Sequence, residues 1–167
     1  MGCDIHSFAE VKRNNKWEKI TDTNNTDPFS WRSYSMFAFL ADVRNYDHCE
    51  SLNEQKGLPK DSEWLNESPR FLEETNFSDI RNNMNYHSHS YFTLKELLDF
   101  DYDKTFWNRR ITRTVGNISN GTSLAEKGEG NIVSYRDNLG QCYFDDIDKL
   151  KELGEPEDVR IIFYFDN

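Results

Sequence analysis

Polar and apolar residues alternate at the start of the chain, as they do along a β-strand that lies against a core. Residues 2–11 place Asp4, His6 and Glu10 on one side of this alternation. The other side is apolar and carries Cys3, Ile5, Ala9 and Val11. The pattern predicts a half-buried strand with an acid and an imidazole on one face. An Asn-Asn turn then predicts a hairpin whose second strand is residues 16–21, because Asn tolerates the left-handed backbone region.

The end of the chain alternates in the same way. Residues 159–167 present Arg160, Tyr164 and Asp166 on one face. Their other face is apolar and carries Val159, Ile161, Phe163 and Phe165. A terminal strand this apolar is expected inside a sheet, because an exposed edge of this kind would aggregate. Pairing it with the first strand would bring its polar face close to the acid and imidazole described above.

Helical patterns separate these two strands. The run 36–44 is apolar at helical spacing, and Ser68-Pro69 is typical of the start of a short helix. Thr93-Leu94-Lys95-Glu96 is a capping box, in which the Thr and Glu side chains satisfy each other's backbone N–H groups. Residues 145–153 predict a last helix. The stretch 114–134 is rich in Gly, Asn and Ser and predicts a long loop or a weak hairpin.

Together these elements predict a single α+β domain over residues 1–167. It has an antiparallel-dominated sheet that includes the N- and C-terminal strands, and three to five short helices. An aromatic content of 14% argues against disorder. A net charge of −10 argues against general nucleic-acid binding, which needs clustered Lys and Arg. Three cysteines without a visible secretory signal indicate reduced thiols inside a cell, and no apolar segment is long enough to span a membrane.

Three of the four histidines fall in two clusters with the same spacing, Asp4-x-His6 and His87-x-His89. Each pair would point to one side of a strand, so we expect all four residues to face a common pocket. They could hold Zn²⁺ or Mn²⁺ with one position open for water, although no complete metal motif requires a cofactor. The alternatives are metal-free acid/base chemistry, direct contact with a ligand, and a hydrogen-bonded structural layer.

Arginine and aromatic residues add candidates for a ligand site. Guanidinium groups bind phosphate in a bidentate manner, aromatic rings stack on bases, and the helix N-terminus after the second histidine pair offers free N–H donors. In so acidic a chain, each arginine could instead be the partner of a carboxylate. The candidate ligand-binding residues are His6, Arg32, Tyr34, Arg44, His87, Ser88, His89, Ser90, Arg160 and Tyr164.

Several short motifs carry a resemblance to a known family. The opening Met1–His6 resembles a family of small bacteriophage proteins that begin with Met-Gly-Cys-Asp-Ile-His. His87–Ser90 is similar to the family's internal His-Ser-His-Ser motif, and residues 163–167 are similar to its Phe-x-Phe-Asp-Asn terminus. The chain departs from the family at Lys56, where Arg is usual, and at Tyr91, where Trp is common.

The resemblance implies a phage accessory protein that acts in the host cytoplasm. Such proteins often counter defence systems that signal with cyclic nucleotides or ADP-ribose derivatives. The first hypothesis is therefore a protein that binds and sequesters such a small nucleotide-type signal. The second is a phosphodiesterase that cleaves a cyclic nucleotide with Asp4, His6, His87 and His89, with or without a metal. The third is a protein–protein inhibitor of a host defence enzyme. The sequence leaves open whether the protein is an enzyme and what its oligomeric state is.

Overall fold

The computed structural model describes residues 2–20, 27–63, 85–115 and 118–167, with the backbone alone over 112–123. The contacts divide the chain into two compact units. Unit 1 comprises residues 1–32, 55–99 and 143–167, and unit 2 comprises residues 33–54 and 100–142. The chain passes between the units four times, so each is assembled from segments that are distant in sequence. The short helix predicted at Ser68-Pro69 lies outside the described residues.

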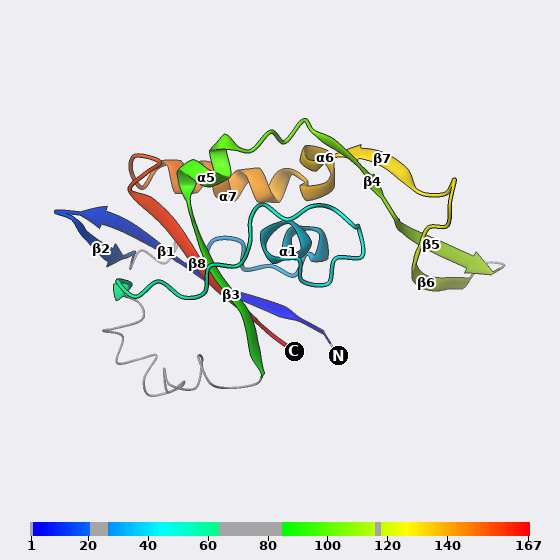
Figure 1. Ribbon diagram of the computed structural model, residues 1–167, viewed down its shortest axis with the longest axis horizontal. Helices are drawn as coiled ribbons and strands as arrows, with labels where there is room; N and C mark the ends of the chain where they lie inside the picture. Colours follow the sequence, from blue (N-terminus) through cyan, green and yellow to red (C-terminus); the bar gives the residue numbers. More distant parts are fainter. Residues whose placement is uncertain (1, 21–26, 64–84, 116–117) are drawn as a thin grey trace. The chain divides into compact units, whose positions relative to one another are not determined.

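Unit 1 is built on a four-stranded antiparallel sheet (Figure 1). Its strands lie in the order β2 (Lys16–Lys19), β1 (Asp4–Arg13), β8 (Val159–Asp166) and β3 (Tyr86–Thr93). The two ends of the chain therefore pair with each other, and β8 lies inside the sheet as predicted. The predicted α+β class, with both terminal strands in an antiparallel sheet, is confirmed.

The first hairpin forms at the predicted Asn-Asn turn. Asn14 and Asn15 have φ angles of 49° and 60°, the left-handed values that suit a tight hairpin. The prediction that β1 is half-buried is wrong for its centre, where Phe8 is only 8% exposed and Glu10 is fully buried. The reason is that residues 55–63 also contact this face, with Leu58 packed beside Phe8.

Two helices belong mainly to unit 1. The helix α5 (Leu94–Asp99) begins at the predicted capping box: Thr93 N donates to Glu96 Oε2 at 2.9 Å, and Glu96 N donates to Thr93 Oγ1 at 3.2 Å. The helix α7 (Gln141–Lys151) corresponds to the last predicted helix and begins four residues earlier than expected. None of the described helices combines the length and apolar character needed to cross a membrane.

Unit 2 contains two helices and two small antiparallel sheets (Figure 1). The helix α1 (Tyr34–Ala41) starts at the N-cap Ser33 and buries six of its eight residues. The other elements are α6 (Tyr135–Leu139), the sheet of β4 (Thr105–Asn108) with β7 (Asn131–Ser134), and the sheet of β5 (Arg110–Val115) with β6 (Ile118–Leu124). Of the two predictions for 114–134, the hairpin is the observed one. The described residues contain four helices, within the predicted range of three to five.

A bulge interrupts β3 at the His-Ser-His-Ser motif. The register with β8 shifts between His87 and Ser90, and Ser88 has a φ of 54°. Such a left-handed residue reverses the alternation of side chains along a strand. His87 and His89 therefore lie on different faces of the sheet, although a regular strand would place them on the same face.

The bulge makes Ser88 sensitive to side-chain shape. We expect Ser88→Val to lower the free energy of unfolding by about 1–2 kcal/mol, because a β-branched residue is strained in the left-handed region. Ser88→Gly is the matched control and should change stability by less than about 1 kcal/mol, since Gly adopts this conformation freely. Urea denaturation followed by circular dichroism measures both. Equal stability of the two variants would contradict the bulge.

The capping box should make stability depend on pH. Burial opposes ionisation of Glu96, but hydrogen bonds from Lys56 and Thr93 outweigh it and lower the pKa of this carboxyl below its usual 4.5. A carboxyl whose pKa is lowered by folding stabilises the folded state at pH values above its pKa in the unfolded chain. This stability is lost as the pH falls through the pKa of the folded state. The free energy of unfolding of the unmutated protein should therefore exceed that of Glu96→Gln at about pH 6, and this difference should shrink by about pH 3. Urea unfolding at both pH values measures the difference. A constant difference would refute this role.

Candidate ligand-binding site

One face of the unit 1 sheet carries polar residues from both terminal strands. The register of β1 with β8 aligns three pairs on this face: Asp4 with Asp166, His6 with Tyr164, and Glu10 with Arg160. The first two pairs form what we call the His6 end, and the third lies at the Arg160 end. The expectation that the last strand brings its polar face to the acid and imidazole of the first strand is therefore confirmed.

At the His6 end, a carboxylate positions an imidazole. His6 Nε2 lies 3.0 Å from Asp166 Oδ2, and Asp166 Oδ1 accepts a hydrogen bond from Asp4 N at 3.2 Å. The side chains of His6 and Asp166 are 40% and 34% exposed, so a ligand can reach both. Among the described residues, His6 Nδ1 has no hydrogen-bond partner. This nitrogen is therefore available to a ligand, in an orientation that Asp166 fixes.

Aromatic stacking extends this end of the face across three strands. The Tyr164 ring lies between His6, with a centroid distance of 4.9 Å, and His89, at 5.8 Å, and both contacts are close to parallel. Tyr86 meets the Tyr164 ring edge-on at 5.2 Å. Tyr164 is only 3% exposed, and burial raises the pKa of its phenol. The phenol therefore stays protonated and serves as the rigid centre of the stack.

Each stacked histidine borders a small hollow. A hollow of about 240 Å³ beside His6 is lined by Ile5, His6, Ser7, Phe8, Asp27 and Ser30. Another, of about 270 Å³, is lined by Gly57, Leu58, Lys60 and His89. Each is slightly below the roughly 300–1,000 Å³ usual for small-molecule sites. The hollow beside His6 is lined from both faces of β1, by Ile5 and Ser7 as well as by His6 and Phe8, so it lies beside this strand.

The predicted common pocket of Asp4, His6, His87 and His89 is wrong for His87. The bulge at Ser88 places its ring 6.0 Å from that of Phe165, on the opposite face of the sheet from Tyr164. His87 Nδ1 lies 2.9 Å from Ser88 Oγ, and Nε2 is buried without a partner among the described residues. His87 and Ser88 therefore do not join His6 and His89.

The residues after the bulge are also engaged within the protein. Ser90 is fully buried, and its Oγ accepts a hydrogen bond from Lys56 N at 3.1 Å. At the start of α5, the capping box directs Thr93 N toward Glu96 rather than toward a ligand. The helix N-terminus predicted as an anion site is therefore occupied by a carboxylate of the chain itself.

Arg32 is paired with a carboxylate at the His6 end. Its Nε and Nη2 donate to Asp4 Oδ1 and Oδ2 at 2.8 and 2.6 Å, and this hydrogen bonding lowers the pKa of Asp4. Gly2 permits the approach, because a Cβ there would lie 2.8 Å from Arg32 Nη1. The Arg32 guanidinium, which was predicted to bind a phosphate, is therefore already bound to the Asp4 carboxylate. Tyr34 and Arg44 belong to unit 2, where the Tyr34 ring packs on Phe37, and they are not part of this geometry.

Arg160 is likewise paired within the protein, in a buried network at the other end of the face. Its Nε lies 2.8 Å from Glu10 Oε2 and its Nη1 lies 2.9 Å from Asp61 Oδ1. Ser62 Oγ donates to Glu10 Oε1 at 2.6 Å, and the Trp17 ring centroid lies 4.0 Å from the guanidinium carbon. The predicted ligand contact by Arg160 is wrong, because its side chain is only 4% exposed.

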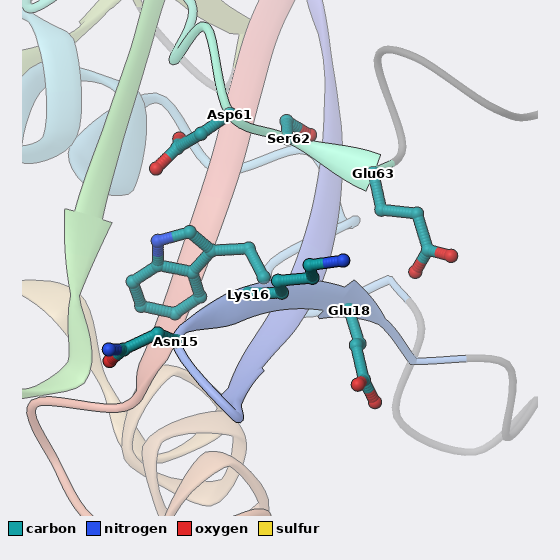
Figure 2. Close-up of a pocket in the computed structure, with 7 residues that line it drawn as sticks. Asn15, Lys16, Glu18, Asp61, Ser62 and Glu63 are labelled. Carbon is teal, nitrogen blue, oxygen red and sulfur yellow. The ribbon is translucent and has the colours of Figure 1, made fainter.

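A pocket of about 450 Å³ opens beside this network (Figure 2). The hairpin of β1 and β2 supplies one wall, and residues 61–63 supply the facing one. The lining residues are Asn15, Lys16, Trp17, Glu18, Asp61, Ser62 and Glu63. Sequence reasoning missed this pocket, because residues 61–63 carry no periodic pattern. The shared parity of Glu10 and Arg160 was the one signal that pointed to it.

Comparisons with known proteins add no assignment. No family model, curated protein or solved structure matches the chain. Within the described part of the chain, no group of three or more His, Cys, Asp or Glu side chains is arranged to hold a metal ion. The geometry of the His6 end, which combines an oriented imidazole with a ring stack, is therefore the main guide to function.

Breaking the buried ion pair should strongly destabilise unit 1. Glu10→Ala leaves the buried guanidinium of Arg160 with the exposed Asp61 as its remaining carboxylate partner, so it should cost about 3–5 kcal/mol of unfolding free energy. Asp103→Ala breaks the exposed pair with Arg136 and is the matched control, which should cost at most about 1 kcal/mol. The double variant Glu10→Leu with Arg160→Leu should recover much of the loss. Similar losses in Glu10→Ala and Asp103→Ala, measured in urea, would refute this account.

Proposed function

We propose that this chain is a phage accessory, anti-defence protein that binds and sequesters a nucleotide-derived host immune signal of the ADP-ribose or cyclic-nucleotide type. The phage context rests on the family resemblance of the sequence motifs. One observation supports the ligand binding: His6 and His89 stack on the two sides of Tyr164, and each borders a hollow.

The proposed contacts follow from the chemistry of these groups. The base of a nucleotide stacks on the outer face of a histidine ring, whose position Tyr164 fixes from the other side. His6 Nδ1, oriented by Asp166, exchanges a hydrogen bond with a ribose hydroxyl or a base. Lys60, which lines the hollow beside His89, supplies a positive charge for a phosphate.

Capture is favoured over catalysis through a covalent intermediate by the state of the neighbouring hydroxyl groups. A phosphodiesterase that forms a covalent intermediate needs a side-chain nucleophile within hydrogen-bond reach of its base, whereas one that activates water does not. Burial keeps the Tyr164 phenol protonated, and Ser7 Oγ is hydrogen-bonded to the Pro28 carbonyl oxygen. A rigid stack with one open imidazole nitrogen suits tight ground-state binding, which is all that a sequestering protein requires.

A phosphodiesterase is the second candidate, and the His6–Asp166 pair is the observation that favours it. A carboxylate that orients an imidazole is the usual arrangement of a general base. This reaction would use His6, Asp166 and His89, whereas His87 lies on the other face of the sheet.

Incubation with a panel of cyclic dinucleotides and ADP-ribose isomers separates the two candidates. After removal of unbound material, heat denaturation releases what the protein held, and mass spectrometry identifies it. Intact ligand supports capture, and a new product supports the phosphodiesterase. Neither binding nor product with any member of the panel would contradict both.

The two stacked histidines should be needed for binding. We expect His6→Gln and His89→Gln each to weaken binding about tenfold, which is about 1.4 kcal/mol, since each loses its ring contact with the ligand. His48→Gln, at the exposed histidine of unit 2, is the matched control and should bind normally. Isothermal titration calorimetry with a ligand from the panel measures the affinities. Unchanged affinity in both stacked-histidine variants would exclude the His6 end as the site.

A further inference from the structure

The hollow beside the first imidazole lies along an unpaired edge of β1. The strand β2 pairs with Glu10–Arg13 only, and beyond it Ile20 N donates to the Ala9 carbonyl oxygen at 3.2 Å. Backbone groups of residues two apart face the same side of a strand, so the N–H and C=O groups of Ile5 and Ser7 also point away from β8. Within the described chain, nothing forms a hydrogen bond with these backbone groups.

These open backbone groups belong to residues that are otherwise enclosed. Ile5 and Ser7 are only 6% and 3% exposed, and both line the hollow. Buried backbone N–H and C=O groups are nearly always hydrogen-bonded to protein, to ordered water or to a ligand. Because no described protein group fills this role, the hollow is the place where water or a ligand completes the edge of β1.

The His6 imidazole, which also lines the hollow, offers a hydrogen-bond acceptor. Its Nε2 lies 3.0 Å from Asp166 Oδ2, and a carboxylate only accepts, so Nε2 carries the ring proton. In the neutral ring, Nδ1 is then a lone-pair acceptor, and the partial exposure of the side chain leaves it accessible. A ligand must therefore donate a hydrogen bond to this nitrogen.

The remaining polar lining adds a carboxylate and no cation. Asp27 and Ser30, from the segment before α1, are both exposed and line the same hollow. Asp27 has no hydrogen-bond or ion-pair partner within the described chain. The described residues that line the hollow include neither a lysine nor an arginine. A phosphate, whose oxygens accept hydrogen bonds, would meet a carboxylate there without any compensating positive charge.

Paired hydroxyl groups match this lining. A hydroxyl both donates and accepts, so it satisfies the carboxylate and the imidazole as well as the open N–H groups of the strand. The cis-diol of a ribose sets two hydroxyls side by side, and a carboxylate that accepts from a ribose hydroxyl is a common device of nucleotide-binding folds. A volume of about 240 Å³, below the usual range for a whole ligand, suits a single sugar ring.

We propose that the hollow beside His6 binds a ribose of the ligand through a free cis-diol, with the phosphates outside the hollow. This inference rests on the function proposed above and specifies its ligand class. Asp27 accepts a hydrogen bond from one hydroxyl, and His6 Nδ1 accepts from the other. The N–H groups of Ile5 and Ser7 donate to the sugar oxygens.

The cis-diol distinguishes the two ligand classes of the proposed function. In a cyclic dinucleotide, the phosphodiester bonds esterify one hydroxyl of each ribose, so no cis-diol remains. ADP-ribose and its isomers keep a free cis-diol on at least one ribose. The proposal therefore selects ADP-ribose derivatives over cyclic dinucleotides.

Periodate treatment of the ligand panel tests this selection on the unmutated protein. Periodate cleaves cis-diols, and borohydride then reduces the aldehydes to alcohols, which leaves bases and phosphates intact. We expect the protein to hold an ADP-ribose derivative from the untreated panel and nothing from the treated one. Capture of a cyclic dinucleotide, or undiminished capture after treatment, would overturn the cis-diol contact and leave sequestration standing. No capture from the untreated panel would contradict the proposed function itself.

The sign of the effect of Asp27→Asn separates ribose from phosphate. The variant loses a charged acceptor, so its affinity for ADP-ribose, or for the isomer recovered from the panel, should fall about tenfold. A phosphate in the hollow would bind the variant more tightly, because a repulsive charge is removed. Asp148→Asn, at an exposed aspartate of α7, is the matched control and should bind normally. Isothermal titration calorimetry measures the affinities, and unchanged or tighter binding by Asp27→Asn would overturn the proposal.

Discussion

The position of β8 between β1 and β3 is the constraint on which the candidate site depends. Seven of its eight residues are buried, so the strand is enclosed on both faces and paired along both edges. Its register fixes which groups meet: Tyr164 lies beside His6, and Asp166 lies close enough to orient it. A slip of one residue would turn every side chain of β8 to the other face and dismantle the stack.

The buried Arg160 network explains why this register is specific. An apolar strand with alternating large residues tolerates small shifts, because each hydrophobic contact is replaced by a similar one. A buried guanidinium does not, since a shift would leave it without Glu10 and Asp61 at a cost of several kcal/mol. We infer that the ion pair contributes less to the net free energy of unfolding than to the selection of one register. The same register of β8 fixes the positions of the groups at the His6 end.

The sequence predicted elements whose signals are local, and failed where contacts come from distant segments. The capping box at Thr93, the Asn-Asn turn and the strand at 159–167 are all where the pattern placed them, because each depends on neighbouring residues alone. The face of the sheet on which His87 lies was predicted wrongly, because the left-handed conformation of Ser88 reverses the alternation of side chains. No propensity scale anticipates such a conformation at a serine. The ion-pair partners of Arg32 and Arg160 could not be predicted from the sequence either, because their carboxylates lie at least 28 residues away along the chain.

The resulting charge balance determines what kind of recognition the His6 end can perform. Asp4 already neutralises Arg32, and Asp166 faces His6, so the His6 end itself offers a phosphate no excess of positive charge, and the proposed phosphate contact falls to Lys60 beside His89. Long-range attraction would therefore contribute little to the affinity for the proposed ligand, which would be recognised by stacking and by hydrogen bonds of fixed direction. Such a site discriminates by the shape of the base and sugar more than by the number of phosphates. This is the selectivity that the proposed sequestration of one signal among other nucleotides would require.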